Sequence, residues 1–157
     1  MIFFHSAAEN ERIKGLKSLS LFHELTTKEL LEVEELLHER NYEPDEIVFD
    51  EGDPGLGLFL VVKGRVKATP TGAHLQKLSL EIPPGEFFGE LALFDQSHRS
   101  ARVVAMEKTL AVALFRAEFF SLLQKNPKIA AKILFELART VSRRARQLLI
   151  TDPTTDI

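Results

Sequence analysis

Residues 87–94 of this chain read FFGELALF, and residues 98–101 read HRSA. Gly89 permits a close approach of ligand to backbone and allows dihedral angles that other residues avoid. Residues 91–93 can begin a short helical turn, whose first N–H groups have no partner inside the helix and form a natural anion site. Arg99 adds a positive charge with a planar donor fork that matches phosphate oxygens. The stretch therefore predicts an anion-binding site.

Glu90 lies inside the same stretch but is unsuited to contact an anion, because two negative groups repel each other. A carboxylate in this position needs hydrogen-bond donors, and a ribose hydroxyl supplies one. We therefore expect a small ligand that carries both an anionic group and a sugar hydroxyl. A second role, as a helix-start carboxylate stabilised by the helix dipole, is compatible with the same position.

This stretch resembles the phosphate-binding cassette of cyclic nucleotide-binding domains: residues 89–93 (GELAL), a short loop, residues 99–101 (RSA) and the apolar residues 103–104. In that family the glutamate holds the ribose 2′-hydroxyl, a role that the resemblance assigns to Glu90. The resemblance assigns phosphate binding to the backbone or side chains of Gly89, Leu91, Ala92, Arg99 and Ser100. It extends to residues 44–64 and to the C-terminal helix, and so covers most of the chain.

The resemblance also indicates where a base would lie. Ala68 and Leu80 fall where the family lines the base pocket with small or apolar side chains, although a plain core role fits them equally well. Arg144 borders the apolar face of the C-terminal helix. Catabolite-activator-like members contact the purine there through small hydroxyl side chains, and Arg144 and Ala145 depart from that pattern. We hypothesise that the Arg144 guanidinium stacks on the purine.

The bulk composition is that of an ordinary globular domain. The chain has 157 residues, of which 45% are hydrophobic and 27% charged, and this length suits one domain. It has no cysteine, which fits a reducing cytoplasm. No apolar run approaches the ~20 residues that span a bilayer, and a net charge of −3 is not that of a nucleic-acid-binding chain. We therefore expect a cytoplasmic protein that contacts neither membrane nor DNA.

An α+β fold is predicted, with a small antiparallel β-barrel or jelly roll flanked by N-terminal helices and a long C-terminal helix. Residues 1–40 are assigned to the N-terminal helices that pack on the barrel. The last of these begins at a capping box of Thr26 and Glu29 and ends near Arg40. Residues 41–116 contain short β-prone runs separated by Gly and Pro, which is typical of a barrel.

Within the barrel the cassette occupies residues 85–103, and residues 117–150 form C-terminal helices that act as a lid. Pro127 suits the first position of the long helix, and residues 151–157 form a loose tail. Apolar residues alternate at three and four along this helix, as in a two-helix seam. The seam predicts a parallel homodimer, although the same stripe could dock on its own barrel. Its members are Ile129 or Ala130, Ile133 or Leu134, Leu137, Val141, Ala145 and Leu148.

No catalytic or metal-binding motif is recognisable, because the five histidines form no paired motif and no Ser-His-Asp arrangement stands out. Catabolite-activator-like regulators carry a helix-turn-helix module after the long helix, whereas residues 151–157 alone follow here. We therefore expect a stand-alone sensor, not an enzyme, that binds cyclic AMP without a metal and reports to a separate, unidentified effector. Cyclic GMP or another cyclic nucleotide is the alternative ligand. A dimeric scaffold with a vestigial pocket and a cupin-like metal enzyme are the alternative functions.

Overall fold

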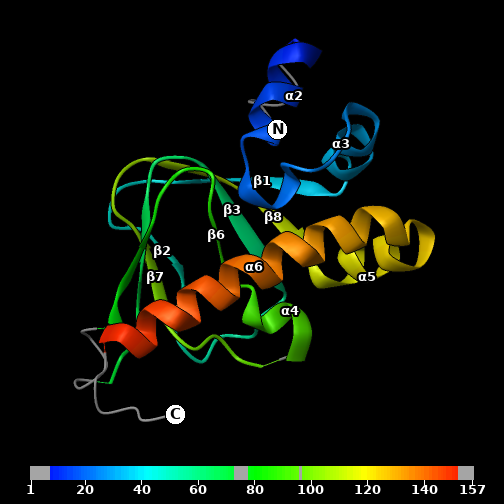
Figure 1. Cartoon of the computed structure of the whole chain (residues 1–157). Helices are drawn as coiled ribbons and strands as arrows, with labels where there is room; N and C mark the ends of the chain where they lie inside the picture. The colour runs from blue at the N-terminus through cyan, green and yellow to red at the C-terminus, as the bar shows by residue number, and fades with distance from the viewer. Residues whose placement is uncertain (1–7, 73–77, 96, 152–157) are drawn as a thin grey trace.

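The computed structural model describes residues 8–72, 78–95 and 97–151. The described residues contain helices at both ends of the chain and a β-barrel between them (Figure 1). The elements, in chain order, are α2 (Glu9–Lys17), the 3-10 helix η1 (Ser20–Phe22), α3 (Thr27–Glu34), β1 (Leu37–Tyr42), β2 (Ile47–Phe49), β3 (Gly57–Lys63), β4 (Val66–Thr69), β5 (Leu80–Ile82), β6 (Phe87–Phe88), α4 (Leu91–Asp95), β7 (Arg102–Ala105), β8 (Thr109–Phe115), α5 (Arg116–Lys125) and α6 (Pro127–Thr151).

Two four-stranded antiparallel sheets form the barrel, in the orders β1-β8-β3-β6 and β2-β7-β4-β5. Strand β3 shows why the sheets have two apolar faces, because successive side chains of a strand point to opposite sides. Leu58 and Leu60 join the core beneath the helices, whereas Phe59 and Val61 join the core inside the barrel. The predicted α+β class with an antiparallel jelly-roll barrel and a long C-terminal helix is confirmed.

The capping box predicted at the start of α3 is confirmed. The Thr26 side chain accepts from the Glu29 amide at 3.2 Å, and the Thr26 amide donates to the Glu29 carboxylate at 2.9 Å. The same carboxylate accepts a 2.7 Å hydrogen bond from Lys132 of α6. This bond, followed by the Thr26 bond, lowers the pKa of Glu29. One carboxylate thus starts α3 and fastens it to α6.

The predicted end of that helix near Arg40 is wrong. Helix α3 ends at Glu34, and Leu37–Tyr42 form β1, which pairs along its whole length with β8. The two adjacent leucines 36 and 37 fitted a helical stripe, but the ladder with β8 satisfies the backbone and buries Leu37. The expected boundary at residue 40 therefore falls inside a barrel strand.

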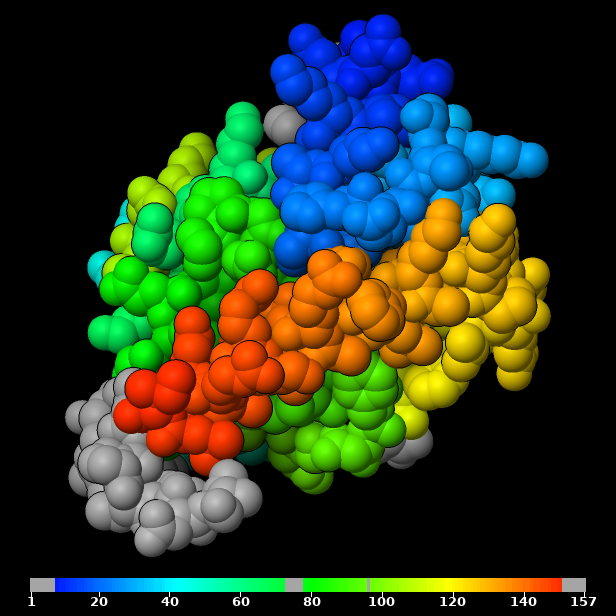
Figure 2. Space-filling view, viewed as in Figure 1, coloured from blue at the N-terminus to red at the C-terminus, as the bar shows by residue number. Residues whose placement is uncertain are grey.

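Helix α6 lies across the barrel and is a surface ridge along much of its length (Figures 1 and 2). Most of the seam predicted in its N-terminal half is intramolecular, because Ile129, Ala130, Ile133 and Leu137 are buried in the core that the helices share with the barrel. Beyond Leu137 the helix emerges, and its exposed residues include Leu148 and Leu149. The tail assigned to residues 151–157 lies outside the described residues from residue 152 onward.

Two glycines with left-handed backbone give a test of the barrel turns. Gly52 and Gly64 have φ of 85° and 87°. A Cβ at Gly52 would meet nothing within 4 Å, whereas one at Gly64 would lie 2.5 Å from the Lys108 carbonyl oxygen. We expect Gly52→Ala to lower the unfolding free energy by about 1–2 kcal/mol, from backbone conformation alone. Gly64→Ala should cost a further ~1–3 kcal/mol for the clash. Urea unfolding measures both, and equal losses would contradict the packing at Gly64.

Candidate functional site

A cavity of about 300 Å³ lies between the inner face of the barrel, the start of α4 and the C-terminal half of α6. Figure 1 shows α4 directly below α6 on this side of the molecule. All nine side chains or backbone positions assigned to a ligand from the sequence line this one cavity: Ala68, Leu80, Gly89, Glu90, Leu91, Ala92, Arg99, Ser100 and Arg144. Residues from the barrel, the cassette and α6 therefore meet at a common site.

Arg99 is one of the two arginines that line the cavity and is 7% exposed. Its Nη1 donates to the Gly89 carbonyl and its Nη2 to the Gly57 carbonyl, both at 2.8 Å. Its Nε is buried and has no hydrogen-bond partner among the described residues. Burial lowers the pKa of Arg99, while the charges of Glu90 and Asp53 act in the opposite direction. The guanidinium is thus held in place while its Nε stays unpartnered, and no carboxylate among the described residues forms an ion pair with it.

Gly89 is required by two independent constraints. Its φ is 76°, a conformation that side chains rarely adopt. A Cβ there would also lie 2.7 Å from Arg99 Nη1 and 3.4 Å from the ring of Phe49. The glycine therefore lets its own carbonyl accept from Arg99 while the backbone turns into α4. The amides at the start of α4 follow directly, and the first of them have no helical partner.

Glu90 is linked to α6 through Arg144. Arg144 Nη1 lies 3.4 Å from Glu90 Oε1, and Nη2 donates to the Phe87 carbonyl. The guanidinium carbon lies 4.6 Å from the centroid of the Phe87 ring. A second carboxylate oxygen, Glu86 Oε2, is 4.0 Å from Arg144 and is buried without a hydrogen-bond partner among the described residues. Arg144 thus joins α6 to the segment that carries Glu90, through contacts with Glu86, Phe87 and Glu90 itself.

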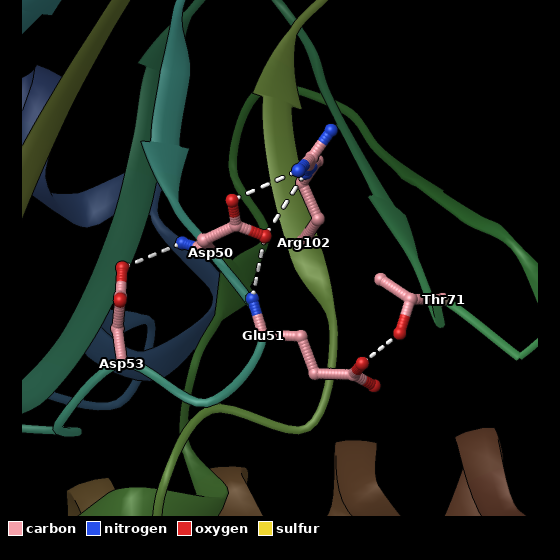
Figure 3. Close-up of polar contacts among 5 residues, drawn as sticks. All are labelled: Asp50, Glu51, Asp53, Thr71 and Arg102. Atoms are coloured by element: carbon pink, nitrogen blue, oxygen red, sulfur yellow. Dashed lines mark hydrogen bonds and ion pairs between the residues drawn. The ribbon is translucent and has the colours of Figure 1, made fainter.

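The turn after β2 fixes the backbone of Arg99. The Gly52 amide donates to the Arg99 carbonyl and the Arg99 amide donates to the Asp53 carbonyl, both at 2.8 Å. Figure 3 shows how acidic side chains hold this turn. Asp50 accepts from Arg102 Nε at 3.0 Å and from Nη2 at 2.9 Å, and the Asp53 carboxylate accepts from the Asp50 amide at 2.8 Å.

The same turn is also tied to the end of β4. The Glu51 carboxylate accepts a hydrogen bond from the Thr71 hydroxyl, as drawn in Figure 3. Because Arg102 belongs to β7 and Thr71 follows β4, one turn contacts two neighbouring strands of the sheet. The position of Arg99, in the loop before β7, is therefore set by a connected surface network and not by that loop alone.

The wall opposite the phosphate-type donors is apolar. This wall includes Val141, Ala145 and Leu148 of α6 together with Ala68 and Leu80 of the barrel. Leu80 is 38% and Leu148 is 48% exposed, so apolar surface stands open at the mouth. Such a wall favours a flat apolar or aromatic group of a ligand over a charged one.

Several lining residues are not identified by sequence reasoning. Phe49, Phe88 and Leu148 line the cavity, and Leu148 lies one helical turn beyond Arg144 and Ala145, where purine contact was expected. No local motif marks Phe49, because it reads as an ordinary strand residue. The period of the C-terminal helix was the available signal for Leu148, since it places residues 141, 145 and 148 on one face.

Neither a metal centre nor a membrane span is found in the part of the chain that the structure describes. No group of three or more His, Cys, Asp or Glu side chains among these residues is arranged to hold a metal ion. None of the described helices is both long enough and apolar enough to cross a bilayer.

The chain is similar in sequence to the cyclic nucleotide-binding domain and to proteins that respond to cyclic nucleotides by name. Residues 39–126, more than half of the chain, match the sequence profile of the cyclic nucleotide-binding domain. The Cyclic AMP receptor protein of Thermus thermophilus is 36% identical over 134 residues, which cover 84% of this chain and 60% of that protein. The cGMP-dependent protein kinase 2 of Mus musculus is 32% identical over 117 residues, which cover 73% of this chain and 15% of the kinase.

A solved structure shares the fold over nearly the whole chain. A cyclic nucleotide-binding domain from Methylobacillus flagellatus superposes with a TM-score of 0.80 at 24% identity, covering 95% of this chain and 85% of that one. By contrast, the chain spans 60% of the length of the Thermus relative and 15% of the length of the kinase.

The Asp50–Arg102 pair should make stability depend on pH at acid values. Arg102 lowers the pKa of Asp50 from its ordinary value of 3.8. The pair therefore stabilises the fold above that value, and this contribution is lost as the pH falls through the lower folded-state pKa. We expect Asp50→Asn to be less stable than the parent at neutral pH, with the two converging once the pH falls below the folded-state pKa of Asp50.

Urea unfolding across the acid range measures this difference. Glu81→Gln is the control, because it removes a carboxylate from the exposed Arg65–Glu81 pair at 3.4 Å. A constant gap between Asp50→Asn and the parent at every pH would show that the charge of Asp50 contributes nothing.

Proposed function

Because this chain belongs to the cyclic nucleotide-binding domain family, we propose that it is a sensor that binds cyclic AMP in the cavity beneath α6. The buried guanidinium of Arg99 is the observation that carries this proposal. No carboxylate in the described part of the chain forms an ion pair with this buried cation, which is costly, and an anionic ligand removes that cost. The cyclic phosphate would lie between Arg99, Ser100 and the backbone of Gly89, Leu91 and Ala92.

The ribose would lie beside Glu90, which is the carboxylate nearest to this anion site along the cassette. The base would then extend toward the apolar wall of Ala68, Leu80 and Leu148. An apolar pocket rejects polar groups that lose water without gaining partners. Guanine carries more such groups than adenine, so this wall supports cyclic AMP over cyclic GMP. The name of the Thermus relative supports the same ligand, while that of the kinase keeps cyclic GMP as the alternative.

Arg144 supplies a route by which the site can act on α6. Arg144 hydrogen-bonds to Glu90 and to the Phe87 carbonyl. A ribose hydroxyl that binds Glu90 would therefore compete with Arg144 for the same carboxylate and alter a contact of α6. A ligand shifts the position of α6 only to the extent that it binds the two positions unequally. We propose that a separate effector protein reads this shift. The suggested stacking of Arg144 on a purine stays a prediction, since in this structure its guanidinium lies over Phe87.

Calorimetric titration with cyclic AMP and cyclic GMP tests the ligand. We expect Arg99→Ala to weaken binding by about 3–5 kcal/mol, because it removes the cation from a buried charge pair. Glu90→Ala should cost about 1–3 kcal/mol for one charged acceptor. Arg65→Ala, which removes a half-exposed arginine paired with Glu81, is the control and should bind like the parent. Unchanged binding by Arg99→Ala would overturn the assignment of the cassette.

The outer face of α6 supports a parallel homodimer. A stripe of exposed residues alternates by four and three along the helix: Ala131, Phe135, Ala138, Ser142, Ala145 and Leu149. Small residues at such positions let two helices approach closely, and Phe135 is 63% exposed. Apart from Ala145, which also belongs to the predicted seam and lines the cavity, this stripe is offset from that seam. We therefore propose that α6 packs on its own barrel through one face and on a second copy through the other.

Sedimentation at micromolar concentration measures this association. We expect the parent to be a dimer and Ala138→Glu to be a monomer, because a carboxylate would be buried in the centre of the stripe. Gln147→Glu adds the same charge off the stripe and should stay dimeric. A parent that sediments as a monomer would contradict the dimer.

A further inference from the structure

The aromatic ring of Phe49 lies against the guanidinium of Arg99. The guanidinium carbon of Arg99 is 4.1 Å from the centroid of the Phe49 ring, whereas it is 5.8 Å from that of Phe59. A cation over the face of an aromatic ring is attracted by the negative π cloud, and more strongly when both are removed from water. Arg99 is 7% exposed, so water screens its charge little at this contact.

Phe49 is itself the end of a supported aromatic cluster. Its ring centroid lies 6.0 Å from that of Phe59 and 5.9 Å from that of Phe88, and the latter two rings stack at 5.3 Å. Phe88 is 3% exposed and belongs to the core inside the barrel. Phe49, by contrast, is only partly buried and lines the cavity. Phe88 also lines the cavity, so the cluster contributes two rings to its wall, and Phe49 is the one that lies against Arg99.

The hydrogen bonds of Arg99 leave a role for this ring. Bonds to the Gly89 and Gly57 carbonyls hold both terminal nitrogens, but they act along the edge of the guanidinium. They do not close either of its faces. The ring closes one face with a surface that also favours the positive charge. Phe49 is followed directly by the turn whose backbone bonds to Arg99, so one segment contacts both the backbone and the charge of this arginine.

We propose that Phe49 is a positioning residue that holds the charged Arg99 guanidinium ready for the ligand phosphate. This inference rests on the proposed cyclic nucleotide function. It adds that Phe49 favours ligands that carry a phosphate over ligands that lack one. The aromatic face, and not merely its bulk, is the property that matters. Phe59 belongs to the same cluster but is farther from the cation, and it provides the matched comparison.

The experiment compares Phe49→Leu, Phe49→Tyr and Phe59→Leu by calorimetric titration with cyclic AMP and with adenosine. Leucine keeps apolar bulk but lacks the π face, so Phe49→Leu should weaken cyclic AMP binding about tenfold. Phe49→Tyr keeps the face and should bind within about twofold of the parent. Phe59→Leu should lower stability while changing affinity by no more than about twofold.

Adenosine separates positioning of the charge from packing, because it lacks the phosphate. If Phe49 acts through Arg99, Phe49→Leu weakens the binding of cyclic AMP and leaves the binding of adenosine unchanged. Equal losses for both ligands would overturn the proposal. Pentafluorophenylalanine placed at residue 49 keeps the ring shape but reverses its charge distribution. This variant therefore tests the role of the π face even if Phe49→Leu impairs folding. It should weaken cyclic AMP at least as much as leucine does, and parent-like affinity would refute the role of the π face.

The titration of the parent protein distinguishes this inference from the function on which it rests. Absence of binding by a folded parent would overturn both. Binding by the parent, with Phe49→Leu and Phe59→Leu losing the same affinity, would overturn the role of Phe49 alone.

Discussion

A positive charge held inside a β-barrel is the constraint around which this structure is arranged. Removing Arg99 from water carries a cost that hydrogen bonds must offset, and two backbone carbonyls provide those bonds. Both carbonyls belong to glycines. A Cβ at Gly57 would collide with the backbone of Leu114, and one at Gly89 with Arg99 itself. The start of β3, the turn into α4 and the acidic turn after β2 therefore all meet at Arg99, which bonds to each of them.

The sequence predicts the site better than its surroundings, for a physical reason. The residues of the cassette are close together in the chain, so their spacing alone reports their chemistry, and all of those assigned to a ligand line one cavity. Phe49 lies 50 positions before Arg99, and the two segments are brought together by the pairing of β2 with β7 and by the backbone bonds of the turn after β2. The same difficulty explains the error at residues 37–40. Whether two leucines continue a helix or begin a strand depends on β8, which lies more than 70 residues away.

Helix α6 shows how one element serves different purposes along its length. Its first half is a core element, with Ile129, Ile133 and Leu137 buried among the N-terminal helices and the barrel. Its second half is the roof of the cavity, where Arg144 contacts Glu86, Phe87 and Glu90. Sequence periodicity gives a single apolar stripe for both halves. It does not reveal that the packing partner changes partway along the helix, because that depends on the curvature of the barrel beneath.

This division leaves α6 anchored at its buried N-terminal half, so its C-terminal end would move most if the helix tilted. Its 25 residues extend over roughly 37 Å, and the buried half is a fulcrum that the Glu29–Lys132 bond helps to fix. Arg144 lies well along the free arm, so a rotation of about 5° around the fulcrum would carry the tip through roughly 2 Å. A small adjustment beside one carboxylate is thereby magnified with distance. Under the proposed function, the far end of the described helix would therefore move more than the cavity itself.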